Sequence, residues 1–279
     1  MIWDIGTRTL DLTRRPCIMG ILNVTPDSFS DGSRFLDTEE AVDRALEMEI
    51  QGADIIDIGG ESTRPCSTPV SEEDELRRVL PVLEKLSGKI RIPISIDTYK
   101  SRVAEESILR GAEIVNDISG FAFDDRMAEV VASTKAGVIL THTSGRPAVM
   151  QKFTEYHSVV AEVISSLRHS ISLAVSAGIS PERIVVDPGI GFGKSSRGNL
   201  EILKRLREFA SLERPILIGT SRKSFIGNVL NRPVEDRIFG TAATVALALA
   251  NGASILRVHD VKEMRDVADM TMSILQAEP

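Results

Sequence analysis

The sequence predicts an α/β fold, a (β/α)8 barrel of the TIM type with a short N-terminal hairpin. Short apolar segments alternate with amphipathic ones about every 30 to 40 residues, which is the interval of a β/α unit. The apolar segments are nearly continuous, a pattern that is typical of parallel strands covered on both faces. About eight units favour a closed barrel over an open doubly wound sheet, so we expect residues 1–279 to form a single domain.

The expected strands and helices alternate strictly after residues 1–16, which we expect to form a hairpin that closes the floor of the barrel. The expected strands are 17–24, 54–60, 93–98, 113–119, 137–143, 183–189, 215–221 and 254–260. The expected helices are 38–52, 71–87, 100–110, 125–136, 154–177, 198–211, 235–250 and 261–276. The second of these helices opens with Ser71-Glu-Glu-Asp, a capping box.

The composition excludes several classes of function. A formal net charge of −7 and a pI near 5.3, without a run of Lys or Arg, argue against a nucleic-acid partner. We expect no signal peptide and no membrane span, because the apolar runs are shorter than the roughly 20 residues that a span needs. Two cysteines, Cys17 and Cys66, make no disulfide framework, which favours a cytoplasmic protein.

Polar residues gather where the expected strands end, and the active site of a (β/α)8 barrel lies at the carboxyl ends of its strands. The opposite ends carry ordinary turn residues such as Gly52, Gly111 and Pro215. We therefore expect one common polar face. Its candidate members are Asn23, Asp57, Asp97, Asn116, His142, Asp187, Ser221, Lys223, Arg257 and His259.

Three of these residues, Asp97, Asn116 and Asp187, follow apolar strand residues and are expected to point into a partly dehydrated pocket. A carboxylate there accepts two parallel hydrogen bonds, which suits a flat heterocycle with adjacent N–H donors. The alternative for each residue is a cap on the helix that follows it. That all three act as caps is the weaker interpretation.

Cationic groups follow the second and the eighth expected strand. Arg257 and His259 alternate along one strand and therefore share a face, from which they could clamp a phosphate or diphosphate near Arg64. A surface ion pair is the alternative for Arg257, and a core or capping role is the alternative for His259. Asn23 offers a hard oxygen suited to Mg²⁺, which takes few protein ligands besides phosphate oxygens.

The glycine-rich run 187–195 matches neither common nucleotide-binding pattern. Pro188 occupies the first glycine of a Walker A sequence, and the glycines miss the dinucleotide spacing. Close approach of the backbone to a ligand or to a neighbouring strand explains them better. Lys194 in this run can be solvated, whereas Lys223 is better placed for a site, and His142 can be catalytic or a structural hydrogen-bonding residue.

Taken together, these residues give a sequence that resembles the dihydropteroate synthase family, the folate-pathway enzymes that sulfonamides inhibit. The resemblance spans nearly the whole chain and is carried by seven motifs in family order. They are GILNVTPDSFSDG (20–32), DIGGESTRP (57–65), SIDT (95–98), NDISG (116–120), DPGIGFGK (187–194), SRKS (221–224) and RVHD (257–260). Seven motifs together are far more specific than any one of them.

The resemblance implies a transferase that joins 6-hydroxymethyl-7,8-dihydropterin diphosphate to para-aminobenzoate and releases 7,8-dihydropteroate and pyrophosphate. The implied pterin-binding residues are Asp97, Asn116, Asp187 and Lys223. The implied diphosphate-binding residues are Asn23, Arg64, Arg257 and His259, with Asn23 also at Mg²⁺. The residues implied at the para-aminobenzoate site and its two closing loops are Phe29, Asp31, Thr63, Arg64, Pro65 and Ser221. The catalytic set is then Asn23, Asp97, Lys223, Arg257 and His259.

A dissociative mechanism is also implied, in which pyrophosphate leaves first and the aryl amine then attacks the pterin cation. No evident base partners Ser62, Ser221 or Cys66 as a nucleophile, which agrees with catalysis by positioning and charge stabilisation. Two residues depart from the family pattern. Cys66 stands where the family usually has Gly, and Thr141 where it usually has Met, which bears on loop kinetics and drug response more than on reaction type.

Two other functions stay open for this sequence. A pterin-binding methyltransferase of the corrinoid type would share the barrel and its acids but would not need Arg257, His259 or the SRKS turn. A catalytically silent barrel would bind pterin as a carrier or regulator. The helix expected at 235–250 is apolar nearly all round and needs cover on more than its barrel face, so we also expect a homodimer.

Overall fold

A closed ring of parallel strands forms the centre of the computed structural model, which describes residues 1–13, 15–25, 34–64 and 67–277. The strands of the main sheet lie in the order β8-β7-β6-β5-β4-β3-β10-β9. They are β3 (Cys17–Asn23), β4 (Ile55–Gly59), β5 (Ile94–Asp97), β6 (Ile114–Asp117), β7 (Gly137–Thr141), β8 (Ile184–Asp187), β9 (Leu217–Ile218) and β10 (Ile255–Val258). A single parallel bridge between Val186 and Ile216 joins the two ends of this sheet. The predicted barrel is confirmed.

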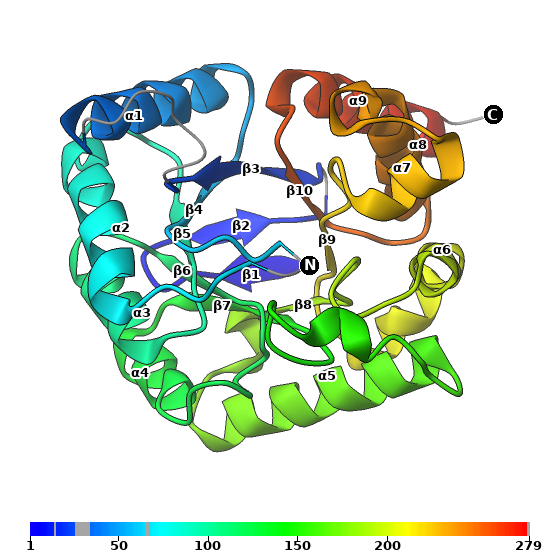
Figure 1. Ribbon diagram of the computed structural model, residues 1–279, viewed down its shortest axis with the longest axis horizontal. Helices are drawn as coiled ribbons and strands as arrows, with labels where there is room; N and C mark the ends of the chain where they lie inside the picture. Colours follow the sequence, from blue (N-terminus) through cyan, green and yellow to red (C-terminus); the bar gives the residue numbers. More distant parts are fainter. Residues whose placement is uncertain (14, 26–33, 65–66, 278–279) are drawn as a thin grey trace.

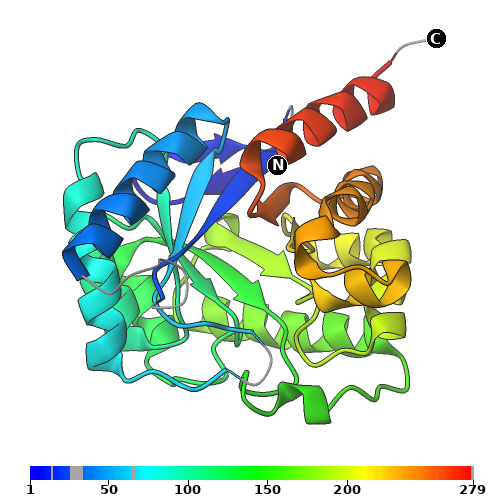
Figure 2. The ribbon, with the colours of Figure 1, turned by 45° about the horizontal axis from the view of Figure 1, so that its top comes forward.

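Helices surround the strands, as the ribbon in Figure 1 shows. They are α1 (Arg34–Ile50), α2 (Glu72–Leu86), α3 (Ser101–Leu109), α4 (Met127–Thr134), α5 (Val159–Ser176), α6 (Ser196–Lys204), α7 (Ser224–Leu230), α8 (Ile238–Ala250) and α9 (Val261–Leu275). Short 3-10 helices are η1 (Met150–Lys152), η2 (Pro181–Arg183), η3 (Leu206–Leu212) and η4 (Val234–Asp236). Figure 2 shows α9 extending beyond the barrel beside α8.

Several expected bounds were wrong near the ends of elements. Helix α1 begins at residue 34 rather than 38, and α5 begins at Val159 rather than 154, so His157 precedes the helix and is exposed. The seventh expected strand is reduced to β9, because the chain turns directly after it. In this turn Arg222 has a φ of 57° and the Lys223 N–H donates to the Thr220 carbonyl at 3.1 Å. Helix α7, which was not expected, follows at once.

The N-terminal hairpin closes the floor of the barrel, as expected. Strands β1 (Ile2–Asp4) and β2 (Thr9–Asp11) pair antiparallel. Trp3 is fully buried, and its indole Nε1 donates to the Arg183 carbonyl at 2.9 Å. Its apolar neighbours in the barrel interior are Ile5, Leu12, Cys17, Met19, Ile55, Ile114, Ile139, Val185, Leu217 and Ile255. The lower interior is therefore a packed apolar core, which leaves the opposite end for chemistry.

Helix α5 is long and apolar enough, by length and composition alone, to cross a membrane; no other helix in the described part of the chain is. Its 18 residues have a mean hydropathy of 1.2. In the structure this helix belongs to the outer ring, where it packs on β7 and α6 and buries Val163 and Leu167 completely. Its apolar side therefore covers the barrel.

Candidate active site

One row of neighbouring strand residues builds the upper end of the barrel. Asn23 of β3 pairs with Gly59 of β4, Gly59 pairs with Asp97 of β5, and Asp97 pairs with Asn116 of β6. Side chains two residues apart on a strand share a face, so these positions point inward above the buried apolar layer. The strand alternation thus brings three of the predicted site residues to the same level of the barrel.

Charged side chains meet inside this end of the barrel. The Arg257 guanidinium of β10 donates from Nε to Asp57 Oδ2 and from Nη2 to Asp97 Oδ2, each at 2.6 Å. The Asn116 amide donates to the same Asp57 oxygen at 3.0 Å. Arg257 therefore makes partly buried ion pairs, so the surface ion pair considered for it was wrong, whereas the phosphate clamp stays a prediction. Ion pairs of this burial are costly to break, because one charge is then left uncompensated.

Two carboxylate oxygens in this cluster have no hydrogen-bond partner among the described residues. They are Asp57 Oδ1 and Asp97 Oδ1, and the hydroxyl of Ser95, which pairs in register with Asp57, is likewise unpartnered. Burial raises the pKa of Asp97 to about 7, against the opposing charge of Arg257. Buried polar atoms without partners are rare, so this end of the barrel offers acceptors to a ligand that brings N–H groups.

Asp187 and Lys223 stand on the opposite side of the barrel mouth. Asp187 Oδ1 accepts a hydrogen bond of 2.7 Å from the Gly189 N–H, and burial raises the pKa of its carboxyl. The Lys223 ammonium donates to the Ile190 carbonyl and lies 4.2 Å from the centre of the Phe192 ring. Burial lowers the pKa of Lys223 to about 8. None of Asp97, Asn116 and Asp187 caps a helix, so the capping alternative was wrong for all three.

The glycine-rich run is shaped by close backbone contacts, as expected. A Cβ on Gly189 would lie 1.9 Å from the His142 carbonyl oxygen, and one on Gly191 would lie 2.8 Å from Cδ of Lys223. Both glycines also have positive φ, 70° and 84°. The run can approach Lys223 and the end of β7 only because these side chains are absent.

Lys194 is buried, so the solvated interpretation was wrong. Its ammonium lies 2.9 Å from His142 Nδ1 and donates to the carbonyls of Gly189 and Phe192 at 2.9 and 3.0 Å. Burial lowers the pKa of Lys194 to about 7 and that of His142 to about 3. His142 thus has the structural hydrogen-bonding role that the sequence had left as one of two alternatives.

His259 and Ser221 form a hydrogen-bonded pair at the ends of β10 and β9. The Ser221 hydroxyl lies 2.9 Å from Nδ1 of His259 and accepts from the His259 N–H at 3.1 Å. Burial and the nearby charges of Arg257, Arg222 and Arg64 lower the pKa of His259 to about 4. A neutral imidazole among three guanidinium groups marks a region that favours an anion.

The remaining predicted residues lie at the rim or outside the described part. Arg64 is exposed and Thr63 is partly buried, both after β4. Phe29, Asp31, Pro65 and Cys66 lie outside the described residues. Among the described residues no group of three or more His, Cys, Asp or Glu could hold a metal ion. The hard oxygen of Asn23 therefore fits Mg²⁺ only if phosphate oxygens complete the shell of the ion.

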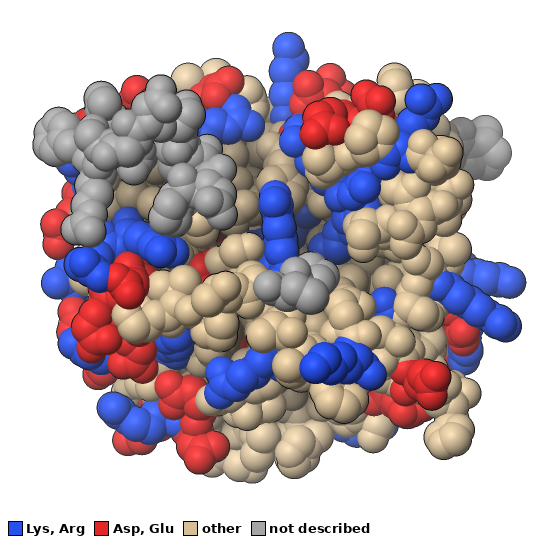
Figure 3. All heavy atoms as spheres, viewed as in Figure 1, with Lys and Arg blue, Asp and Glu red and all other residues tan. Residues whose placement is uncertain are grey.

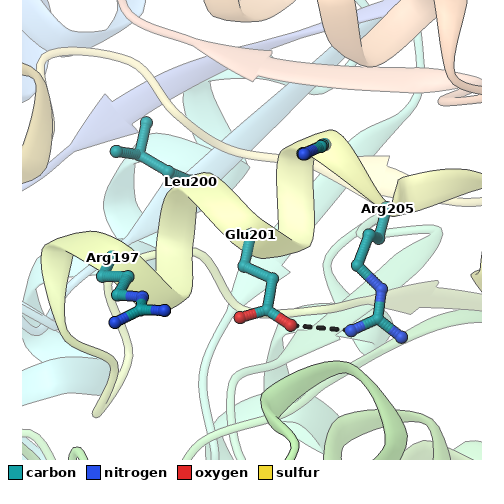
Figure 4. Close-up of a pocket in the computed structure, with 5 residues that line it drawn as sticks. Arg197, Leu200, Glu201 and Arg205 are labelled. Atoms are coloured by element: carbon teal, nitrogen blue, oxygen red, sulfur yellow. Dashed lines mark hydrogen bonds and ion pairs between the residues drawn. The ribbon is translucent and has the colours of Figure 1, made fainter.

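The surface agrees with an anionic ligand at the barrel mouth. Figure 3 shows Lys and Arg atoms within a hollow at the middle of the face, although the net charge of the chain is −7. A separate hollow of about 400 Å³ lies on the outside of α6 (Figure 4). Its wall is formed by Arg197, Leu200, Glu201, Lys204 and Arg205, and none of the strand-end residues contributes to it.

Comparisons with known proteins agree with this geometry. The model of the family described as "Pterin binding enzyme" matches residues 19–259. The dihydropteroate synthase of Bacillus subtilis is 45% identical over 266 residues, which cover 95% of this chain and 91% of that one. The dihydropteroate synthase of Escherichia coli K12 is 44% identical over 270 residues, which cover 97% and 95%. This chain belongs to the dihydropteroate synthase family.

Solved structures of the dihydropteroate synthase family superpose closely on this chain. The Clostridium difficile enzyme in the presence of pteroic acid has a TM-score of 0.91 and 46% identity, covering 96% of this chain and 100% of that one. The Xanthomonas albilineans enzyme with 4-aminobenzoic acid has a TM-score of 0.93 and 40% identity, covering 99% of each chain. The family makes the chain a transferase of the dihydropteroate synthase class.

Two buried acids near this site of the dihydropteroate synthase fold had received no role from the sequence. Asp57 was predicted to be a strand-end residue but had no function of its own. It lies two residues before Gly59 on the same face of β4, and this spacing could have placed it in the site. Glu61 follows β4, accepts a hydrogen bond of 2.6 Å from Tyr99 Oη and pairs with Lys100. These contacts of Glu61 have no comparable signal in the sequence.

Proposed function

We propose that this chain joins 6-hydroxymethyl-7,8-dihydropterin diphosphate to para-aminobenzoate, giving 7,8-dihydropteroate and pyrophosphate. The observation that carries the proposal is the inward-facing row with Asp97 and Asn116. Asp97 and the nearby Asp57 each offer an unpartnered carboxylate oxygen there, and cationic side chains surround them. The names of the related proteins support it, because those enzymes are dihydropteroate synthases. One solved structure is described as obtained in the presence of pteroic acid and another as a structure with 4-aminobenzoic acid.

The heterocycle would bind between Asp97 and Asn116 on one side and Asp187 and Lys223 on the other. A dihydropterin carries N–H donors on more than one side of its ring system, so carboxylates on opposite sides can both accept from it. Lys223 supplies a donor for the carbonyl and ring nitrogen acceptors. All four side chains are buried or half-buried, so their hydrogen bonds would be stronger than in water.

The diphosphate would lie beside Arg257, His259 and Arg64, with Asn23 as the protein ligand of Mg²⁺. Mg²⁺ at this position would neutralise charge that develops on the leaving oxygens. Arg257 and Arg64 would add fixed positive charge, and the His259 imidazole would donate from the ring nitrogen that Ser221 does not contact. Positioned charge of this kind is the main catalytic contribution that the site can make.

The reaction would proceed by dissociation of the C–O bond to the diphosphate, with the bonding electrons leaving on pyrophosphate. The remaining pterin methylene cation is stabilised by the electron-rich ring. The neutral amine of para-aminobenzoate then forms the C–N bond and loses a proton, so no dedicated base is required. Phe29, Asp31, Thr63, Arg64, Pro65 and Ser221 would shape the aminobenzoate site and its closing loops, which exclude water.

Product analysis tests this function against its two rivals. The full-length protein, Mg²⁺, the dihydropterin diphosphate and para-aminobenzoate should give dihydropteroate and pyrophosphate in equal amounts. Asp97→Asn should lower kcat/KM by roughly 10- to 100-fold, as expected for loss of a hydrogen bond to a charged group. Methyl transfer from a methylpterin to a corrinoid would favour the methyltransferase instead. Pterin binding without either product would favour a carrier.

We also infer a homodimer formed through α8 and α9. Phe239 and Leu247 on α8 are 84% and 59% exposed, and Met270 and Ile274 on α9 are 62% and 63% exposed. Each pair is spaced to lie on one helix face, and the two helices pack against each other. An apolar surface of this kind is typical of a protein interface.

Residues 1–279 are inferred to form one domain, and the protein is inferred to be cytoplasmic. The barrel core and the floor that Trp3 closes support a single folding unit. Cys17 is a free, buried thiol, which agrees with a reducing compartment.

A further inference from the structure

Asp57 connects the two halves of the proposed site through one oxygen atom. Its Oδ2 accepts from Arg257 Nε at 2.6 Å and from the Asn116 amide at 3.0 Å, and the side chain is fully buried. Arg257 belongs to the proposed diphosphate half, and Asn116 to the proposed pterin half. Because Asp57 contacts a residue of each half, it can couple pterin binding to diphosphate binding.

The second contact of Arg257 blocks part of the pterin half. Its Nη2 donates to Asp97 Oδ2 at 2.6 Å, while Asp97 Oδ1 is unpartnered. A heterocycle that donates two parallel hydrogen bonds to Asp97 brings its second donor to Oδ2, the oxygen that already accepts from Nη2, and so crowds the guanidinium there. Binding of the heterocycle should therefore displace Arg257 from Asp97.

The displaced guanidinium is held by Asp57. A buried Arg charge is strongly disfavoured without a partner, and the Nε bond to Asp57 keeps one in place when the Asp97 bond is lost. The ion pair with Asp57 involves only the edge of the guanidinium near Nε, which leaves Nη1 and Nη2 as donors for an anion. Rotation about this anchored edge would turn both donors toward the diphosphate.

We propose that Asp57 is a positioning residue, the pivot on which Arg257 turns from Asp97 to the diphosphate as the heterocycle binds. The inference rests on the proposed function, since it takes Asp97 as the pterin acceptor and Arg257 as the diphosphate donor. It deepens that function by making the two half-sites interdependent. Coupling of this kind is reciprocal, so a diphosphate on Arg257 must also strengthen pterin binding at Asp97.

Titration calorimetry on the full-length protein measures this coupling. The affinity for 6-hydroxymethylpterin is determined with and without saturating Mg²⁺-pyrophosphate, and the affinity for pyrophosphate with and without the pterin. The wild type should show the same tightening in both directions, about 5- to 150-fold. In Asp57→Asn the tightening should fall to less than about 2-fold, because the neutral amide no longer holds the displaced guanidinium.

The matched control is Asp54→Asn, which removes an aspartate paired with Arg265 at the opposite end of the barrel. It should retain the wild-type coupling. If Asp57→Asn does not fold, Arg257→Lys is measured instead. A lysine keeps the positive charge but has a single nitrogen, so it cannot bind Asp57 through one nitrogen and an anion through others, as a guanidinium can. Loss of coupling in that variant supports the pivot.

Three results would contradict the proposal in distinguishable ways. Wild-type protein that binds neither ligand would overturn the proposed function together with the pivot. Wild-type protein that binds both ligands independently would overturn the pivot alone. Wild-type tightening in Asp57→Asn would also overturn the pivot alone. If Asp57→Asn does not fold, wild-type tightening in Arg257→Lys would overturn it in the same way.

Discussion

Lys194 and His142 are joined by a buried contact of 2.9 Å between Nζ and Nδ1. When Lys194 is protonated it only donates, so Nδ1 of His142 is then the acceptor and the neutral imidazole carries its proton on Nε2. The same ammonium donates to the carbonyls of Gly189 and Phe192. One side chain thereby fixes the glycine-rich run against the end of β7, and with it the surroundings of Lys223.

Lys194→Met should lower the free energy of unfolding by about 1 to 3 kcal/mol. The substitution keeps the length of the side chain but leaves the acceptors at His142, Gly189 and Phe192 without their donor. Urea unfolding measures the difference. Lys204→Met, which changes an exposed lysine on α6, is the control and should stay within about 0.5 kcal/mol of the wild type. Equal losses in the two variants would contradict the assigned role.

His142 should make the fold sensitive to acid. Its pKa is lowered to about 3 by burial and by Lys194, against an ordinary value of 6.5. The unfolded chain therefore binds more protons between these values, so stability falls as the pH drops from about 6.5 toward 3. At pH 5 this loss amounts to about 2 kcal/mol relative to neutral pH.

His142→Asn should remove much of this acid sensitivity, because its side-chain oxygen still accepts from Lys194 but does not titrate. The measurement is the free energy of unfolding at pH 7 and at pH 5 for both proteins. His169→Asn, on the exposed side of α5, should keep the wild-type difference. An unchanged pH difference in His142→Asn would show that other groups cause the loss.

Gly191→Ala should weaken pterin binding about 10-fold. The new Cβ would lie 2.8 Å from Lys223 Cδ, so the lysine must move from its position over Phe192. Gly178→Ala is the matched control, since Gly178 also has a positive φ, 95°, but its Cβ would meet no atom within 4 Å. Both variants should lose about 1 kcal/mol of stability from backbone strain. Calorimetry with 6-hydroxymethylpterin should separate them, and equal affinities would contradict the contact.

Leu247→Glu should convert the proposed dimer to a monomer. Leu247 is an exposed apolar residue of α8 in the proposed interface, where a charge would be buried without a partner. Sedimentation velocity at micromolar concentration measures the change. Ile50→Glu is the control, because Ile50 is 87% exposed at the end of α1 and outside the proposed interface. A wild-type protein that sediments as a monomer would refute the interface itself.

The row of site residues could be predicted from the sequence because it follows from strand alternation. Asp97 and Asn116 each end an apolar strand, and parallel strands in a barrel present their carboxyl ends together. The N-terminal hairpin that carries Trp3 was predictable for a similar reason, since short apolar and polar pieces alternate before the first strand of the barrel. These features depend on local pattern and on the direction of the chain.

The side-chain partners at the site could not be predicted in the same way. Arg257 contacts Asp57 and Asp97, which precede it by 200 and 160 residues, and the choice among several acids depends on how the barrel closes. The burial of Lys194 depends on three backbone carbonyls that a loop turns toward it. No spacing in the sequence encodes those contacts.

A crystal structure with 6-hydroxymethyl-7,8-dihydropterin and Mg²⁺-pyrophosphate is the decisive measurement for the proposed site. We expect N–H groups of the heterocycle within hydrogen-bond distance of Asp97 and Asp187, and pyrophosphate in contact with Arg257. We also expect Nη2 of Arg257 to have left Asp97 while Nε remains on Asp57. A heterocycle bound away from Asp97 and Asp187, or a pyrophosphate that does not touch Arg257, would show that the proposed site is wrong.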